Sequence, residues 1–273
     1  MVRVYRIDSS RKEIIDFGSN LTNKLVIANI IFYILMIFGI GFYGDKIIDL
    51  FALTPSIILS GKNLWSFLTS MFMHGSFFHL FANMFSLFFI GNFLEKIIGR
   101  KRIFWVYLIS GLVGGIFYVL ATIIFGGIDI PAVGASGALF GLLGVLAVLV
   151  PNSKIYLITG PLILIVFEVI AIPFLPASLA SIVSTIVNIL ILLMIFAIFS
   201  FNQNFRKFAV PLELSMWMLP FVAIIPLAIV GLFVTLPIGN SAHFGGLLVG
   251  LIYGFYLKNK FPRKTADLNK RFH

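Results

Sequence analysis

Cysteine is absent from all 273 positions, and charged residues make up only 11% of the chain. The first absence excludes disulfides and thiolate-bound metals, and we expect neither a metal nor another cofactor. The second excludes an ordinary soluble domain, because so little polar surface cannot cover a chain with 60% hydrophobic residues and a mean hydropathy of +1.09. The composition therefore predicts a polytopic membrane protein.

Long apolar runs without alternating polar positions take up most of the chain. The runs cover roughly residues 25–43, 77–94, 103–125, 135–151, 155–176, 177–201, 214–238 and 242–257. Most are near the ~20 residues that cross ~30 Å of hydrocarbon as a helix, whereas a spanning barrel needs alternation with a period of two. We expect an all-α fold with about eight transmembrane helices.

Acidic residues are scarce as well, with 10 Asp and Glu against 20 Lys and Arg. If the loops alternate between the two sides of a membrane, 18 of the 20 basic residues lie on one side, and only Lys46 and Lys62 lie on the other. The positive-inside rule then predicts a multi-pass protein, in the plasma membrane, with both termini in the cytoplasm. This asymmetry accounts for the net charge of +10, so we expect lipid and no nucleic acid as a partner. The predicted divisions are a cytoplasmic segment (1–24), a transmembrane domain (25–258) and a basic tail (259–273).

Three polar groups interrupt the apolar runs at one predicted depth. They are His79 with Asn83, then Ser136, and then His243. His79, Ser136 and His243 precede the polar residue that ends each run by 16, 16 and 15 residues, respectively. At a rise of ~1.5 Å per residue, all three lie ~22–24 Å above the inner boundary. A serine, an imidazole and further donors are therefore expected together near the outer face.

This set of residue types suits hydrolysis by a serine nucleophile. A serine hydroxyl is weakly nucleophilic and needs a base, which His243 can supply to Ser136. His79 and Asn83, four residues apart on one helix face, can donate hydrogen bonds to the oxyanion. Each residue also has a structural interpretation: Ser136 as a small packing residue, and Asn83 as a bond between helices.

The chain resembles the rhomboid intramembrane serine proteases, and the resemblance covers residues 64–150 and 240–258. The matching stretches are Met73-His74-Gly75 through His79-xxx-Asn83, Glu95-xxx-Gly99, Gly134-Ala135-Ser136-Gly137 and Ala242-His243-xx-Gly246-xxx-Gly250. The resemblance implies a Ser136–His243 dyad with His79 and Asn83 at the oxyanion. The residues expected to support this site are Gly134, Gly137, Phe140, Gly246 and His74.

The resemblance also implies a six-helix core with a loop, about residues 44–76, in the outer leaflet. Trp65 looks like the Trp of the family's Trp-Arg motif, but Ser66 stands where the Arg is expected. Ser136 and His243 are 107 positions apart, which exceeds the family's usual spacing, so we place an extra transmembrane hairpin at about 155–201. We expect this hairpin at the periphery, packed through the polar stripe Ser181, Ser184, Thr185 and Asn188.

The function predicted from these residues is hydrolysis of peptide bonds in or near transmembrane segments of other membrane proteins. Two alternatives remain open. One is a non-catalytic rhomboid-like protein that binds membrane proteins. The other is a small-solute or proton transporter that uses His79, His243 and Glu168 as a relay. Glu168 itself either orients the base or bonds to a neighbouring helix.

Overall fold

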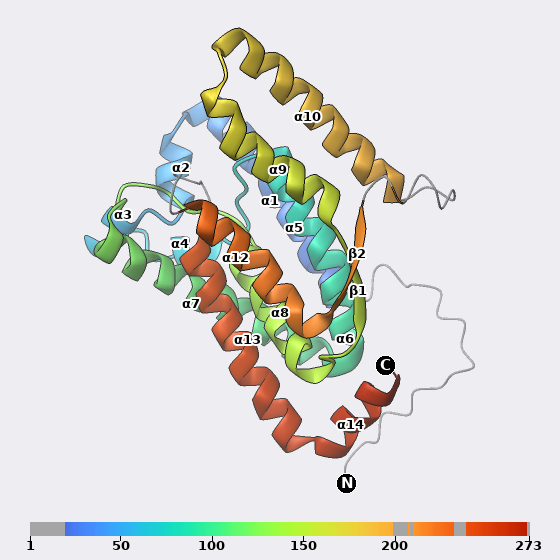
Figure 1. Cartoon of the computed structure of the whole chain (residues 1–273). Coiled ribbons are helices and arrows are strands. Elements are labelled where there is room, and N and C mark those ends of the chain that lie inside the picture. Colours follow the sequence, from blue (N-terminus) through green and yellow to red (C-terminus); the bar gives the residue numbers. More distant parts are fainter. Residues whose placement is uncertain (1–19, 199–206, 208–209, 232–238, 272–273) are drawn as a thin grey trace.

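The computed structural model describes residues 20–198, 207, 210–231 and 239–271. The longer helices are α1 (Leu21–Tyr43), α5 (Phe77–Ser86), α6 (Asn92–Ile98), α7 (Arg100–Phe125), α8 (Ser136–Leu149), α9 (Thr159–Ala171), α10 (Ala177–Ile198), α12 (Leu219–Gly231), α13 (Asn240–Lys260) and α14 (Pro262–Arg271) (Figure 1). Three short helices lie between α1 and α5: α2 (Lys46–Phe51), α3 (Pro55–Leu59) and α4 (Ser66–Thr69). Most of the predicted N-terminal segment, and the predicted span residues 199–201 and 232–238, lie outside the described residues.

Apolar helices dominate the described chain, as an integral membrane protein requires. Four stretches are long and apolar enough to cross a membrane: Leu21–Tyr43, Phe77–Ile98, Arg100–Phe125 and Ala177–Met194. Shorter apolar helices cover Ser136–Leu149, Thr159–Phe174 and Met216–Ile225. The helical class is thus confirmed, whereas the number of eight spans stays a prediction.

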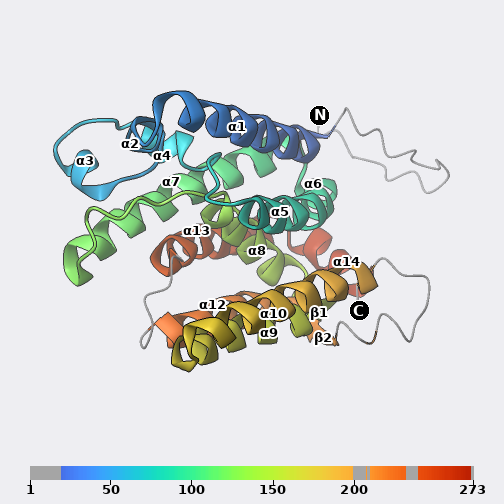
Figure 2. The same ribbon diagram turned by 90° about the horizontal axis from the view of Figure 1, so that it is seen from above.

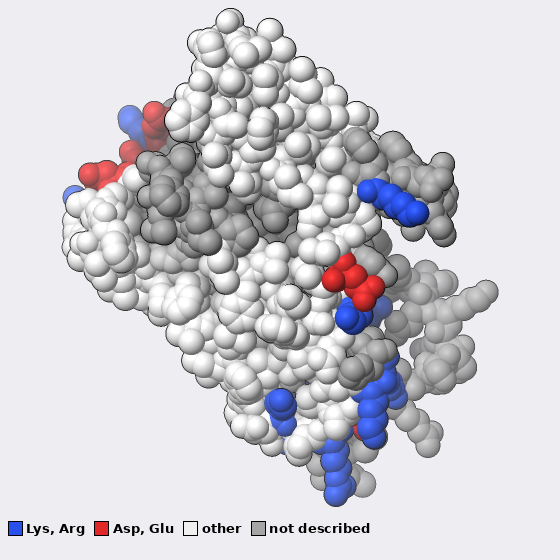
Figure 3. Space-filling view, in the orientation of Figure 1, with Lys and Arg blue, Asp and Glu red and all other residues white. Residues whose placement is uncertain are grey.

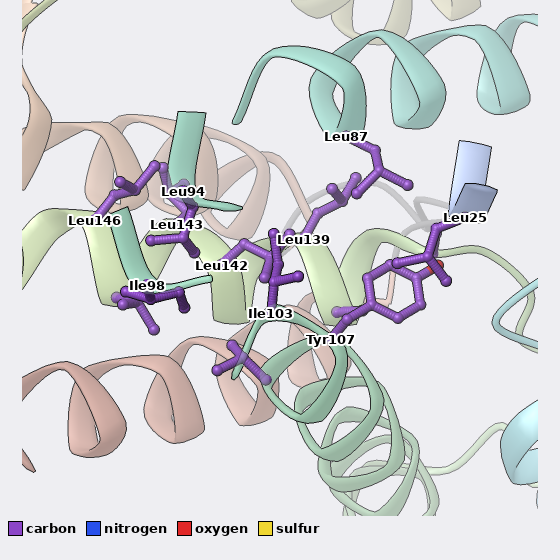
Figure 4. Close-up of a cluster of buried hydrophobic side chains, with 14 of the residues drawn as sticks. Leu25, Leu87, Leu94, Ile98, Ile103, Tyr107, Leu139, Leu142, Leu143 and Leu146 are labelled. Atoms are coloured by element: carbon purple, nitrogen blue, oxygen red, sulfur yellow. The ribbon is translucent and has the colours of Figure 1, made fainter. Parts of the chain in front are cut away.

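The helices form a layered bundle around α8. Figure 2 shows α1 and α7 on one side, α9, α10 and α12 on the other, and α8 and α13 between them. Leu142 and Leu146 of α8 are fully buried and pack with Ile103 and Tyr107 of α7 in the main core (Figure 4). All residues of α8 except Ser136 and Phe140 are buried, so the surrounding elements hold this helix in position.

The second span combines α5 and α6 through a π-helical turn, Leu87–Gly91. At its far end the buried Glu95 carboxylate accepts hydrogen bonds from the backbone N–H groups of Leu21 and Thr22 at 2.9 and 2.8 Å. These are two of the donors that the start of a helix leaves without partners. Glu95 therefore caps α1 and holds it against the second span.

A two-stranded antiparallel sheet departs from the purely helical prediction. Strand β1 (Lys154–Ile158) pairs with β2 (Pro211–Ser215), and Lys154 lies 3.5 Å from Glu213 across the pair. The helices predicted from 155 and 214 begin only at Thr159 and Leu219. Short apolar runs do not distinguish strand from helix by periodicity, and this pairing joins segments far apart in the chain.

Helices α9 and α10 form an antiparallel pair at the edge of the bundle (Figures 1 and 2). The predicted polar stripe on α10 does not face the core as a unit. Ser184 and Asn188 hydrogen-bond to Glu168 of α9, and Thr185 bonds to the carbonyl oxygen of Ser181 in its own helix. The prediction that the hairpin packs through the whole stripe was therefore wrong, because among the described residues the carboxyl group of Glu168 on α9 accepts hydrogen bonds only from Ser184 and Asn188.

Charged side chains gather at the ends of the bundle and leave a wide uncharged surface between them. Figure 3 shows Lys and Arg concentrated toward the end that carries α14, and a smaller mixed group near α2 and α3. Such a band is typical of a surface that faces lipid.

Candidate active site

Ser136 is the first residue of α8, the buried helix at the centre of the bundle. Gly134 precedes it with φ +125°, a conformation that side chains other than glycine rarely adopt. The N–H of Gly134 donates to the carbonyl oxygen of Ser70 at 2.8 Å, and Ala132 pairs with Leu53. The segment that leads to Ser136 is therefore fixed by backbone contacts with the loop between the first two spans.

His243 lies in the first turn of α13, and its Nε2 is 2.8 Å from the Oγ of Ser136. Its side chain is almost fully buried, and its ring stacks on Phe140 with the centroids 4.5 Å apart and the planes 22° apart. Among the described residues, His243 Nδ1 has no hydrogen-bond partner. An aromatic face, rather than a carboxylate, thus orients the imidazole toward the serine.

Glycines let α8 and α13 run side by side with almost no gap. A Cβ at Gly246 would overlap the carbonyl oxygen of Gly137, and one at Gly250 would overlap that of Gly141. On α7, a Cβ at Gly114 would lie 2.8 Å from the carbonyl oxygen of Ala242. Small residues of this kind permit close approach of membrane helices. Three helices are therefore held in contact at the level of Ser136.

His79 and Asn83 lie on the other side of Gly134. A Cβ at Gly134 would come within 2.8 Å of His79 Nε2 and 3.5 Å of Asn83 Nδ2. Asn83 is 6% exposed, and its Nδ2 has no hydrogen-bond partner within the described part of the chain. Buried donors without partners are rare, and here the donor lies close to Gly134, two residues before Ser136 in the sequence. The pair can donate hydrogen bonds to an oxygen that forms beside Ser136.

His74 supports this pair from the segment before α5. Its Nδ1 lies 3.3 Å from the carbonyl oxygen of Phe72, and its ring meets the ring of His79 edge-on with centroids 5.1 Å apart. Ser76 caps α5 by accepting a hydrogen bond from the N–H of His79 at 3.1 Å. This hydrogen bond therefore fixes the first turn of α5, which carries His79.

Every site residue predicted from the sequence lies within this cluster or on the two helices that form it. The sequence did not single out Ser70, Gly114 or Phe117, although Phe117 packs on Gly245 of α13. Gly111, Gly114 and Gly115 in one apolar helix were the signal for a close contact. Glu168 lies apart from the cluster: its hydrogen bonds go to Ser184 and Asn188.

The loop between the first two spans is anchored without the expected arginine. The indole N–H of Trp65 donates to the carbonyl oxygen of Leu50 at 2.9 Å, and the hydroxyl of Thr69 donates to that of Phe51 at 2.8 Å. Ser66, in the position of the arginine, is buried. Side-chain bonds to the backbone of α2 therefore hold this loop.

Two comparisons with known proteins, one with family models and one with individual proteins, point to the same family. The Rhomboid domain model matches residues 61–189. Inactive RHOMBOID-like protein 8 of Arabidopsis thaliana is 35% identical over 119 residues, 43% of this chain and 32% of that protein. RHOMBOID-like protein 1 of Arabidopsis thaliana is 43% identical over 106 residues, 38% of this chain and 26% of that protein. Rhomboid protease GluP of Bacillus subtilis is 32% identical over 146 residues, 53% of this chain and 27% of that protein.

The matched segments span about a quarter to a third of those relatives. The matched domain carries His79, Asn83 and Ser136. With the apolar helices and the rhomboid-named relatives, this match shows that residues 61–189 carry a rhomboid domain.

Proposed function

We propose that the protein is an intramembrane serine protease that cleaves transmembrane segments of other membrane proteins. The observation that carries the proposal is the 2.8 Å contact between Ser136 Oγ and His243 Nε2 on two parallel, closely packed helices. A protease-named relative supports it. In this proposal both termini are cytoplasmic, the chain crosses the plasma membrane eight times, and the domain covers residues 25–258.

The proposed reaction begins when His243 Nε2 accepts the hydroxyl proton as Ser136 Oγ attacks the scissile carbonyl carbon. The resulting oxyanion accepts hydrogen bonds from Asn83 Nδ2, His79 and the N–H of Ser136. His243 then returns the proton to the departing amine, and the peptide bond breaks. Water attacks the acyl-serine with His243 again as base, which releases the acid product and restores Ser136. His243 Nδ1 has no hydrogen-bond partner among the described residues, so in this proposal Ser136 and His243 alone carry the proton transfers.

The proposed substrate is a helix that unwinds locally, because the carbonyl groups of an intact helix are hydrogen-bonded and shielded. Glycine, proline or small residues near the outer end of the substrate helix favour this opening.

An activity-based probe tests the proposal without knowledge of the substrate. Purified protein in detergent is treated with a fluorophosphonate, which phosphonylates activated serines. The wild type is expected to be labelled and Ser136→Ala is not, while the control Ser60→Ala, at an exposed serine on the loop, is labelled like the wild type. Equal labelling of wild type and Ser136→Ala contradicts the proposal.

The inactive relative supports one second candidate, a non-catalytic protein that binds membrane helices. In both candidate functions a helix of another membrane protein binds beside α5 and α8. Only the protease forms a covalent adduct with the probe. If the folded wild type binds a transmembrane peptide but does not react with the probe, the result supports the non-catalytic binding protein.

Asn83 provides a prediction about the oxyanion donors. Asn83→Ala is expected to lower kcat by about 10- to 10³-fold, because one of several donors is lost while His79 and the Ser136 N–H remain. Asn83→Asp keeps the shape and replaces the donor by an acceptor, so the loss should be at least as large. Initial rates on a model transmembrane substrate measure both. An active Asn83→Asp variant excludes Asn83 from the oxyanion site.

Glu168 provides a prediction about the base. Because its hydrogen-bond partners are on α10, Glu168→Gln is expected to leave the cleavage rate near that of the wild type at every pH. Glutamine can still accept from Ser184. A pH–rate profile of both proteins measures this. A large fall in kcat with the fold intact would restore Glu168 as a third member of a catalytic triad.

A further inference from the structure

A cleft of about 470 Å³ opens between the start of α1 and the start of α7. It is lined by Leu21, Lys24, Arg100, Lys101, Phe104 and Trp105. Gly114, which contacts the serine and histidine helices, is about 20 Å farther along α7, so the cleft is separate from the proposed active site. Its volume is in the range of small-molecule sites.

Positive charge is in excess at this cleft. Three of its six lining residues are cations and none is an acid. Arg100 pairs with the nearby Glu95 at 3.6 Å, but the Glu95 carboxylate also caps α1. Lys24 and Lys101 form no ion pair within the described part of the chain. Gly99, which has no side chain, caps α7, so the first N–H groups of that helix also favour an anion.

An apolar surface continues directly from the charged residues. Phe104 and Trp105 meet edge-on with centroids 5.3 Å apart, and Trp105 is 56% exposed. Tryptophan is enriched at the boundary between headgroups and hydrocarbon. Beyond it, Ile27 and Ile31 on α1 and Ile109 on α7 are also exposed. A ligand that fits both parts has an anionic head and a hydrocarbon tail.

We propose that this cleft binds an anionic glycerophospholipid from the leaflet at the Lys- and Arg-rich end of the bundle. The phosphate lies between Lys24, Arg100 and Lys101, and the glycerol and upper acyl chains lie against Trp105. Basic pockets between membrane helices are suited to such headgroups. The adjoining apolar track favours a lipid over a free phosphate compound.

Native mass spectrometry of the full chain, released from micelles that contain equal amounts of phosphatidylglycerol and phosphatidylcholine with identical acyl chains, tests the proposal. The wild type is expected to retain phosphatidylglycerol preferentially. Lys24→Gln/Lys101→Gln, which leaves the Arg100–Glu95 pair in place, should lower the ratio of the two bound lipids by roughly tenfold. The matched control Lys264→Gln/Lys270→Gln removes the same charge from α14 and should keep the wild-type ratio.

Three results overturn the proposal. One is equal retention of the two lipids by the wild type, and another is an equal fall in the ratio for the control variant. The third is displacement of phosphatidylglycerol by an excess of glycerol 1-phosphate, which would assign the cleft to a free phosphate compound. Circular dichroism checks the fold of each variant. If the double variant unfolds, quenching of tryptophan fluorescence tests the proposal instead. Brominated phosphatidylglycerol should quench the wild type more than brominated phosphatidylcholine does, and this difference should be lost in Trp105→Phe.

Discussion

Replacement of Ser136 or His243 by alanine is expected to lower cleavage of a transmembrane substrate by on the order of 10⁴-fold or more, to the background of a mock preparation. In the proposed mechanism the serine supplies the attacking oxygen, and the histidine removes its proton across the 2.8 Å contact. The close packing of α8 on α13 depends on glycines, which both substitutions leave in place, although His243→Ala removes the ring that stacks on Phe140. Both variants should therefore stay folded.

The double variant distinguishes a dyad from two independent effects. Residues that act as one unit are strongly non-additive, so Ser136→Ala/His243→Ala should be no slower than either single variant. The measurement is the cleavage rate of all four proteins in one lipid mixture. Appreciable turnover by a single variant, or a double variant whose loss is the product of two partial losses, contradicts the dyad.

Gly246→Val is expected to destabilise the protein and to lower the cleavage rate by about 10²-fold. A Cβ at this position overlaps the carbonyl oxygen of Gly137, and backbone cannot move aside as a flexible side chain can. We expect a loss of about 3 kcal/mol in the free energy of unfolding, at the upper end for overpacked sites. His243, one turn away on the same helix, would shift from Ser136, and a misplacement of about 1 Å costs about 10²-fold in rate.

Gly41→Val is the matched control for this prediction. Gly41 is also within an apolar helix, α1, but a Cβ there meets nothing within 4 Å. Both substitutions add the same side chain, so the difference in unfolding midpoint in mixed micelles measures the α8–α13 contact. Equal midpoints for the two variants would show that the close approach does not stabilise the fold.

The depth of the polar residues was the sequence feature that predicted most of the site. Ser136 and His243 are 107 residues apart, yet their nearly equal predicted distance from a membrane boundary indicated that they lie at one level, because lipid fixes one coordinate of every spanning helix. The depth alone did not predict which groups face each other around that level, and Phe140 was expected to support the site only from the rhomboid resemblance. The stacking of Phe140 on His243 depends on helix rotation, which the packing of α7 and α13 determines.

The elements that the sequence did not predict depend on contacts between distant segments. Residues 154–158 and 211–215 form strands only because they pair with each other. The same residues alone continue an apolar run. The cap that Glu95 provides for α1 is another example, because the motif around Glu95 gives no indication that its partners are the N–H groups of Leu21 and Thr22.

The π-helical turn at Leu87–Gly91 has a consequence for changes in chain length. In a regular helix, at ~100° per residue, the twelve residues from Asn83 to Glu95 would leave the two side chains ~120° apart. A π turn accommodates about one extra residue, which reduces the angle to ~20° and keeps both on the buried face. Loss of one residue within this turn would restore a regular helix with both still buried, whereas loss of one between His79 and Asn83 would turn one of that pair by ~100° relative to the other and shift it by ~1.5 Å along the helix. The second span can thus absorb a one-residue deletion at its middle, whereas a deletion at the end that carries His79 and Asn83 displaces one of these two residues.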